Sequence, residues 1–326
     1  MKTKLTQSQL GIYLATLNQT EDENYNNPIY FELPASTDLD RLARTVEAFV
    51  EAHPYVKGHI VTDESGDLCM EDNDAPFKCP IIDVDDFDTF KFTLGGSYAL
   101  LGADLAEAAI YRDSRGAYLF FNINHVVLDG TGVVIMSKEI SRGYAGETLE
   151  AEPFTGHDVS QLEQEVRSGD FMREAREWYE NEYAGVERPS PIASVSNGPT
   201  GFCKEHFPID IDQKALRTAT RRNRTAKSTF FNAAFALMLS RLSGEPRASY
   251  ATVHSGRDDN RTARTIDMLV RTMPVSLDCS PARTVDELLI DSDRQANDSR
   301  RYSAAYSFGD FCHVTNFDVS VNFVFQ

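Results

Sequence analysis

The sequence is poor in several features that mark particular classes of protein. It has 326 residues but only five cysteines, and no two of them form a C-x-x-C pair. An odd number of widely spaced cysteines argues against a disulfide framework or a zinc site and favours reduced thiols in the cytoplasm. The chain starts without a long apolar segment, so no signal peptide is expected. No run approaches the roughly 18 apolar residues that cross a bilayer, so no membrane span is expected.

Positive charge is also scarce. The chain has 32 Lys and Arg against 50 Asp and Glu, a formal net charge of −18. An acidic surface repels both nucleic-acid phosphates and anionic lipids, so we expect neither as a partner. The segment 216–227 is the local exception, with four arginines and one lysine. It is either a solvated helix face or a docking site for an acidic partner.

Several catalytic signatures are missing. The sequence has no G-x-S-x-G, no Walker A loop and no convincing dinucleotide fingerprint. A serine-hydrolase elbow, ATP and NAD are therefore not implied, and no metal site is expected.

The patterns that are present indicate an α+β protein. Amphipathic helices and short strands occur in both halves of the chain, and 41% of the residues are hydrophobic. Residues 185–201 are rich in proline, serine and glycine and predict a linker. We therefore expect an N-terminal lobe over 1–184 and a C-terminal lobe over 202–326.

The most informative stretch is "FFNINHVVLDGTG", Phe120 to Gly132. Alternating apolar residues predict a strand, and the spacing after Gly130 predicts a helix, so His125 and Asp129 lie in the connecting turn. One interpretation is a purely structural turn, in which Gly130 lets the backbone bend. The other is a histidine acid–base centre without a nucleophile of its own.

The stretch "NHVVLDG" resembles the H-H-x-x-x-D-G motif of the condensation domains of nonribosomal peptide synthetases, members of the chloramphenicol acetyltransferase-like superfamily. Further segments resemble the family in the same order along the chain: "LTQSQLGIYLATLNQ", "LARTVEAFVEAHPYVKGHI", "AREWYENEYAG" and "VHSGRDD…IDMLVRTMP". Together they span nearly the whole sequence.

The resemblance implies two lobes in a V, each with helices packed on a mixed sheet, and a tunnel between the lobes. His125 would be the catalytic residue, with Asp129 and Gly130 in architectural roles. The C-terminal lobe would be incomplete at residue 326, because family members continue beyond this strand. His254, Arg257 and Arg271 would be candidates for the cleft.

The sequence departs from the family at four positions. Asn124 replaces the first histidine of the motif, and Lys57 stands where the family has an arginine that pairs with the motif aspartate. Asp267 replaces a glycine and Arg271 an asparagine in the later motif.

The implied function is amide-bond formation between an acyl or aminoacyl thioester and an amine in nonribosomal peptide synthesis. The thioester would arrive on the phosphopantetheine of a carrier protein, and the domain itself would bind no cofactor. We expect a monomeric domain of a larger synthetase. Two alternatives stay open: a stand-alone acyltransferase that uses coenzyme A, and a catalytically silent relative that only docks carrier domains.

Overall fold

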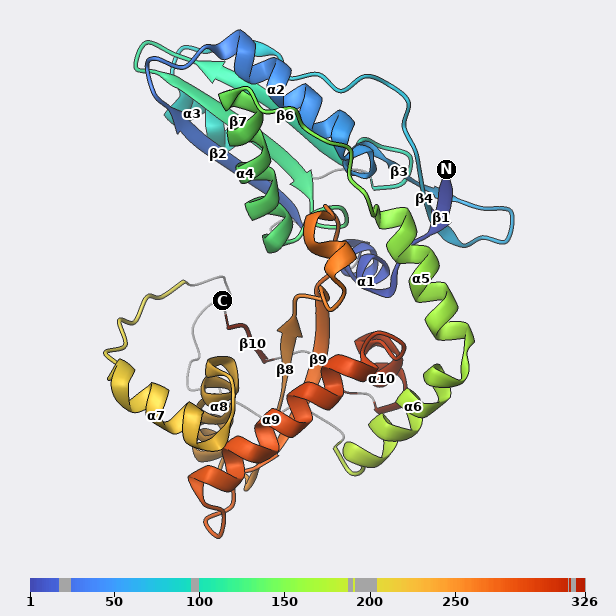
Figure 1. Ribbon diagram of the computed structural model, residues 1–326, viewed down its shortest axis with the longest axis vertical. Coiled ribbons are helices and arrows are strands. Elements are labelled where there is room, and N and C mark those ends of the chain that lie inside the picture. The colour runs from blue at the N-terminus through green and yellow to red at the C-terminus, as the bar shows by residue number, and fades with distance from the viewer. Residues whose placement is uncertain are drawn as a thin grey trace. The chain divides into compact units, whose positions relative to one another are not determined.

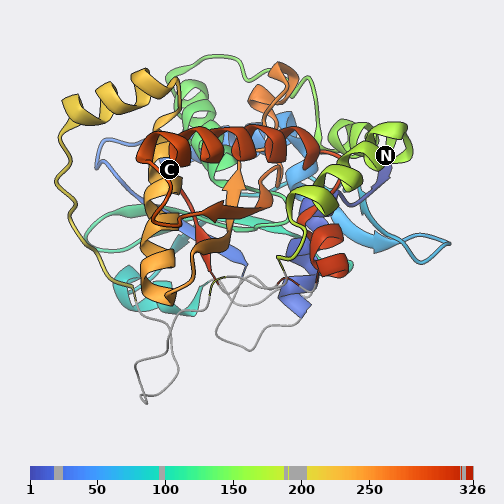
Figure 2. The ribbon, with the colours of Figure 1, turned by 90° about the horizontal axis from the view of Figure 1, so that it is seen from below.

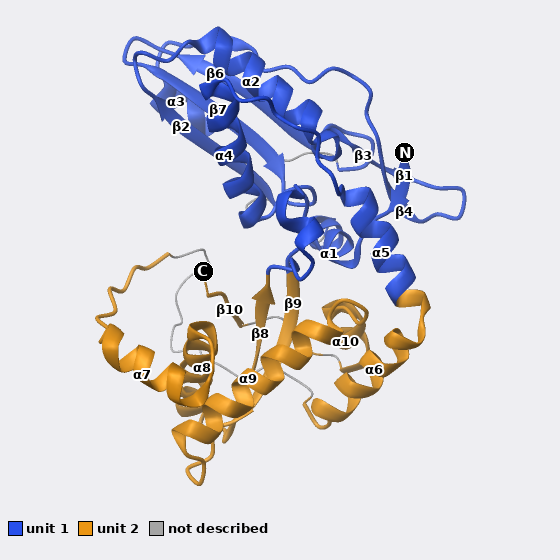
Figure 3. Cartoon of the chain, viewed as in Figure 1, with its two compact units in different colours: residues 1–166, 255–270 blue, residues 167–254, 271–326 orange. Residues whose placement is uncertain are grey.

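The computed structural model describes residues 1–17, 25–94, 100–186, 190, 204–315, 317 and 321–325. These residues divide into two compact units (Figure 3). Unit 1 contains residues 1–166 and 255–270, and unit 2 contains residues 167–254 and 271–326. Among the described residues, no helix combines the length and the apolarity that spanning a bilayer requires.

Unit 1 contains two sheets and the helices that accompany them (Figure 1). The four-stranded sheet has the order β2 (Asn26–Leu33), β7 (Ala117–Asn124), β6 (Ala106–Arg112) and β5 (Ile81–Asp83). The pair β5–β6 is parallel and the other two pairs are antiparallel. The three-stranded sheet has the order β1 (Lys2–Lys4), β4 (Leu68–Glu71) and β3 (His59–Thr62), all antiparallel. The helical elements are α1 (Gln7–Leu17), α2 (Leu39–Ala52), η1 (Pro54–Lys57), α3 (Phe87–Phe90), η2 (Lys91–Thr93), α4 (Gly130–Ala145), α5 (Gly156–Ser168) and η3 (Asn260–Arg264).

Strand β7 forms as its alternating sequence predicts, and both of its faces are buried. Leu119 and Phe121 belong to the main core of unit 1, which also contains the apolar stripes of α2 and α4. Phe120 packs on the opposite face in a separate aromatic cluster with Phe87 of α3. Because both faces are covered, a shift of one residue in register would move every side chain of the strand to the wrong core.

Unit 2 has a three-stranded mixed sheet in the order β10 (Asn322–Phe323), β8 (Arg247–His254) and β9 (Arg271–Asp278). Helices α8 (Lys227–Ser243) and α9 (Val285–Tyr302) pack together and share one core with the sheet (Figure 2). The other helices are α6 (Asp170–Glu182), α7 (Gln213–Asn223) and α10 (Phe308–Thr315). The expected α+β class, with helices on mixed sheets, is confirmed in both units.

The boundary between the two units differs from the predicted one because of the contacts that α6 makes. Trp178 of α6 stacks on Tyr302 of α9 with ring centroids 5.1 Å apart. The Tyr183 hydroxyl donates to the Pro274 carbonyl of β9 at 2.6 Å. The predicted boundary after residue 184 therefore lies inside unit 2, because this aromatic packing ties α6 to the second core. Of the predicted linker, only residues 185, 186 and 190 lie within the described residues.

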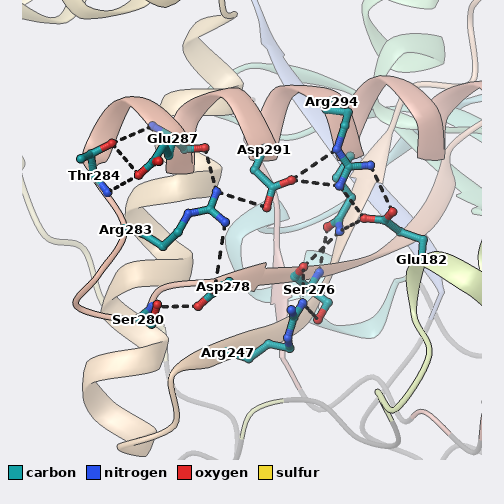
Figure 4. Close-up of polar contacts among 11 residues, drawn as sticks. Glu182, Arg247, Ser276, Asp278, Ser280, Arg283, Thr284, Glu287, Asp291 and Arg294 are labelled. Carbon is teal, nitrogen blue, oxygen red and sulfur yellow. Dashed lines mark hydrogen bonds and ion pairs between the residues drawn. The ribbon is translucent and has the colours of Figure 1, made fainter.

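Polar contacts fix the start and the outer face of α9 (Figure 4). Thr284 and Glu287 form a reciprocal capping box at its N-terminus. Two turns further on, Arg294 forms ion pairs with Asp291, at 2.9 Å, and with Glu182 of α6, at 2.7 Å. These pairs are partly exposed, so each contributes no more than about 1 kcal/mol.

A buried charged cluster joins four segments of unit 1. His53, at the end of α2, is 0% exposed, and its Nε2 lies 2.8 Å from Glu139 of α4. Its Nδ1 lies 3.4 Å from a carboxylate oxygen of Glu152. Arg264 donates to Glu139 at 2.9 Å, and the backbone N–H of Ile266 donates to Glu152 at 2.6 Å. The cluster therefore ties residues 264–266 to α2 and α4.

The cluster shifts the ionisation of its members. Burial lowers the pKa of His53, but Glu152 and Glu139 together raise it by more, so the net change is upward. Burial raises the pKa of Glu152, and this effect exceeds the lowering by His53. Both shifts mean that the folded protein holds protons more tightly than the unfolded chain does.

We expect the free energy of unfolding to fall as the pH rises from about 6.5, the unperturbed value for histidine, through the raised pKa of His53. Below that pH range His53 is protonated in both the folded and the unfolded state. Above it His53 is neutral, and the buried carboxylates of Glu139 and Glu152 lose their cation. The slope reaches at most about 1.4 kcal/mol per pH unit. His53→Gln removes the titrating group and should flatten this part of the profile. Urea unfolding followed by circular dichroism at a series of pH values measures it.

The control is His59→Gln, because His59 pairs with the exposed Asp104 on the surface. This variant should keep the wild-type slope. An identical slope in His53→Gln and the wild type would show that the buried cluster does not govern the pH dependence.

Candidate active site

The candidate site is the turn between β7 and α4. The strand ends at Asn124, and the helix begins at Gly130 with Asp129 as its N-cap. The carboxylate of Asp129 accepts the N–H of Gly132 at 2.7 Å, which satisfies one of the free donors of the first turn. His125 lies at the first position after the strand.

Asn124 has a structural role at the motif's first position. It is 1% exposed, and its side-chain oxygen accepts the N–H of Val126 at 2.9 Å. Its amide donates to Asn26 of the neighbouring strand β2 at 2.7 Å. Asn124 thus closes the turn on one side and links it to β2 on the other, with no titrating group.

The backbone of His125 is hydrogen-bonded, but Nδ1 of its ring has no hydrogen-bond partner. Its N–H donates to the carbonyl of Tyr25 at 2.7 Å, and the Tyr25 ring meets the imidazole edge-on, with centroids 6.4 Å apart. The ring is partly exposed, whereas Nδ1 is buried and has no hydrogen-bond partner. No carboxylate of the described residues orients this ring, so a serine-protease type of triad is not formed here.

The cation that pairs with Asp129 is Arg257. One guanidinium nitrogen, Nη2, donates to both carboxylate oxygens of Asp129, at 2.9 and 3.1 Å. The other, Nη1, donates to the carbonyls of Thr262 and Thr265, at 2.8 and 3.0 Å. The side chain of Asp129 is 0% exposed and that of Arg257 is 9% exposed. The pair therefore lies in a low-dielectric setting, where a lost partner leaves an uncompensated charge.

The predicted pairing of Asp129 with Lys57 is wrong. The Lys57 ammonium group donates to both oxygens of Glu51, at 2.8 and 2.9 Å, and to the carbonyl of Ala75 at 3.0 Å. These three acceptors use all three donors of the ammonium group. Lys57, at the position of the family's arginine, therefore binds Glu51 and Ala75 instead of Asp129.

The role of Gly130 also differs from the prediction. Its φ is outside the left-handed region, and a Cβ at this position would meet nothing within 4 Å. The glycine that the backbone requires is Gly256, next to Arg257. Its φ is +68°, and a Cβ there would lie 1.8 Å from the carbonyl oxygen of Leu269.

The remaining predicted site residues lie in unit 2. His254 ends β8 and Arg271 begins β9, and the two face each other in the antiparallel register. Both are half-buried. Their proximity to a cleft stays a prediction. The pairing of Arg257 with Asp129 was not predicted from the sequence, because 128 residues separate them and no local pattern joins them.

The sequence matches the family described as "Condensation domain" over residues 2–326. The chain belongs to the condensation domain family.

Among its relatives, bacitracin synthase 3 of Bacillus licheniformis is 20% identical over 301 residues, which is 88% of this chain and 5% of that synthase. Malformin synthetase mlfA of Aspergillus brasiliensis is 25% identical over 265 residues, 78% of this chain and 5% of that protein. The chain thus spans a small part of the length of these relatives.

Solved structures share the fold. The condensation domain of the Monacolin K polyketide synthase MokA superimposes with a TM-score of 0.78 at 17% identity, covering 99% of this chain and 78% of that one. The X-domain from teicoplanin biosynthesis, solved in complex with OxyB, gives 0.80 at 15% identity, covering 97% of this chain and 74% of that one.

We expect Gly256→Ala to lower the free energy of unfolding by about 2 kcal/mol or more, because alanine strains the left-handed backbone and collides with Leu269. Gly130→Ala is the matched control and should change it by no more than about 0.5 kcal/mol. Urea unfolding followed by circular dichroism compares the two variants. Equal losses would contradict the assignment of the conformational requirement to Gly256.

Proposed function

We propose that this condensation domain forms an amide bond between an acyl or aminoacyl thioester and an amine, within nonribosomal peptide synthesis. The observation that carries the proposal is the partly exposed ring of His125, on a turn that Asn124 and the Asp129–Arg257 pair hold from two sides. A rigid turn with one titratable side chain suits a reaction whose main demand is to align two bound reactants.

In the proposed reaction the amine nitrogen attacks the thioester carbonyl carbon. The C–N bond forms, the C–S bond breaks, and the sulfur leaves as a thiol. His125 takes the proton that the amine loses and returns it to the departing thiolate, or holds the amine while the proton moves. No covalent enzyme intermediate is required, which agrees with the absence of a nucleophilic signature in the sequence.

The proposed substrates arrive on phosphopantetheine arms of carrier domains, so the domain needs no cofactor of its own. The tunnel between two lobes belongs to this proposal. Among the described residues, Cys69, Cys79 and Cys279 are free thiols, which supports placing the protein in a reducing compartment such as the cytoplasm. We propose that the chain works beside carrier domains of a larger synthetase.

Two alternatives have specific support. The starter condensation domain of rhizomide synthetase RzmA was solved with C8-CoA, which favours a coenzyme A thioester as an alternative donor. Asn124, at the motif's first histidine position, favours a domain that binds partners without catalysis. The X-domain complexed with OxyB is a structural neighbour that has a protein partner.

We expect His125→Ala to lower the rate of amide formation by about 10²–10⁴-fold, the usual contribution of a positioned acid–base group. The assay combines the purified chain with acyl-N-acetylcysteamine thioesters, octanoyl-coenzyme A and a set of amino acids, and detects the amide by mass spectrometry. Thioesters of both kinds separate the two donor classes.

His313→Gln is the matched control, since His313 lies near the end of α10 in unit 2. It should keep the wild-type rate. If the wild type forms the amide and His125→Ala forms it at a similar rate, the proposed role of His125 is contradicted. A wild type that is inactive toward the whole panel but binds a carrier domain would support the docking alternative.

A further inference from the structure

Unit 1 contains a buried carboxyl group directly beside the candidate site. Asp267 is 0% exposed and lies where the resemblance places a glycine. Its Oδ1 accepts the side-chain amide of Gln9 at 2.8 Å and the N–H of Met268 at 2.7 Å. Its Oδ2 is buried and has no hydrogen-bond partner. An ionised carboxylate would leave that oxygen charged and unsolvated, so this geometry suits a neutral acid.

The surroundings of Asp267 oppose ionisation. Burial raises its pKa well above the usual range, and the carboxylates of Asp129 and Glu152 raise it further. The N–H of Met268 and the guanidinium of Arg257 lower it, each by less than burial raises it. The geometry and the charges both favour the protonated form of Asp267.

Gln9 connects Asp267 to the turn that carries His125. It is 0% exposed, and its amide nitrogen lies 3.2 Å from the carbonyl oxygen of Val126, the residue directly after His125. The same nitrogen lies 2.9 Å from the hydroxyl of Tyr55, which is 1% exposed. Among the described side chains, Gln9 is therefore the one that bridges the carboxyl group and this carbonyl.

The orientation of Gln9 depends on its acceptors. An amide side chain can present either its oxygen or its nitrogen, and only the nitrogen can donate to Val126. Asp267 Oδ1 already accepts from Met268 and faces Gln9 as an acceptor, so it selects the nitrogen. At the other end, the oxygen of Gln9 accepts the N–H of Thr6 at 2.9 Å. Both ends of the amide are thus fixed.

We propose that Asp267 is a positioning residue for His125: as a neutral acid it orients the Gln9 amide, which holds the Val126 carbonyl and so fixes the turn that presents the imidazole. Asn124 holds the N–H of Val126 at 2.9 Å, so the peptide groups on both sides of Val126 are fixed. The proposal deepens the proposed function and rests on it for the catalytic consequence. The placement of the ring is testable without any assay of activity.

Two variants separate the parts of this proposal. Asp267→Asn keeps an oxygen acceptor and has no charge at any pH, so the turn should be unchanged. Asp267→Ala removes the nearest acceptor of the Gln9 amide nitrogen, at 2.8 Å, and leaves its two hydrogens to the Tyr55 hydroxyl and the Val126 carbonyl, so the amide is free to turn away from Val126. Val46→Ala is the matched control, because Val46 is 0% exposed in the same core and makes no side-chain hydrogen bond.

Proton–carbon NMR of the histidine rings tests the placement directly. The chain has seven histidines, and the signal of His125 is the one missing from His125→Ala. We expect the His125 signal to shift or broaden in Asp267→Ala and to keep its wild-type position in Asp267→Asn and Val46→Ala. If Asp267→Ala leaves the signal unchanged, or if Val46→Ala moves it equally, the proposal is overturned.

Kinetics and stability give two further tests. Where the wild type forms amide, kcat should fall about tenfold or more in Asp267→Ala with KM within about twofold, and Asp267→Asn should stay within about twofold of the wild type. If the wild type is inactive, the proposed function is contradicted, but the NMR result still tests whether Asp267 positions the His125 ring.

The folding constant of the wild type should fall relative to Asp267→Asn by up to about tenfold per pH unit above the usual carboxyl pKa, since only the folded state retains that proton. The groups facing Asp267 that also titrate are Asp129, Glu152 and Tyr55, and they are common to both proteins. Parallel pH profiles would show that Asp267 is ionised in the fold and would overturn the neutral-acid part. Asp267→Asn is expected to fold, so this comparison can be made even if Asp267→Ala does not fold.

Discussion

The ion pair between Asp129 and Arg257 is the interaction on which the candidate site depends. Asp129 performs two tasks with one carboxylate, because it caps α4 and accepts the guanidinium. Arg257 in turn binds the carbonyls of Thr262 and Thr265. The rigid fork of arginine reaches these acceptors together, which the point charge of a lysine would not do. A buried pair of this kind adds little net stability but strongly favours one arrangement of its segments.

That pair is one of several attachments that hold residues 255–270 within unit 1. The second is the cluster in which Arg264 and Ile266 meet the carboxylates of Glu139 and Glu152. The third is the contact of Asp267 with Gln9 of α1. Each attachment joins buried polar groups by hydrogen bonds, and Asp267 Oδ2 is a buried oxygen that has no partner. The turn that carries His125 is thus built from three distant parts of the chain.

The sequence predicted the local structure around the site well, because alternation and helical spacing are local signals. The strand to Asn124, the turn and the helix from Gly130 all occur as expected. The apolar alternation of "KEHFPIDI", residues 204–211, also predicts a strand, but these residues are not in one, and Phe207 is 79% exposed. Apolar alternation alone does not supply a neighbouring strand. The partner of Asp129 could not be predicted from local patterns either, because only the fold brings Arg257 close to it.

A double-mutant cycle on the free energy of unfolding tests the central claim, that Arg257 rather than Lys57 holds the turn. The cycle uses Asp129→Asn and Arg257→Gln, and a parallel cycle replaces Arg257→Gln by Lys57→Gln. We expect a coupling energy of at least about 1.5 kcal/mol for Asp129 with Arg257, and additivity within about 0.5 kcal/mol for Asp129 with Lys57. Additivity in the first cycle, or strong coupling in the second, would contradict it.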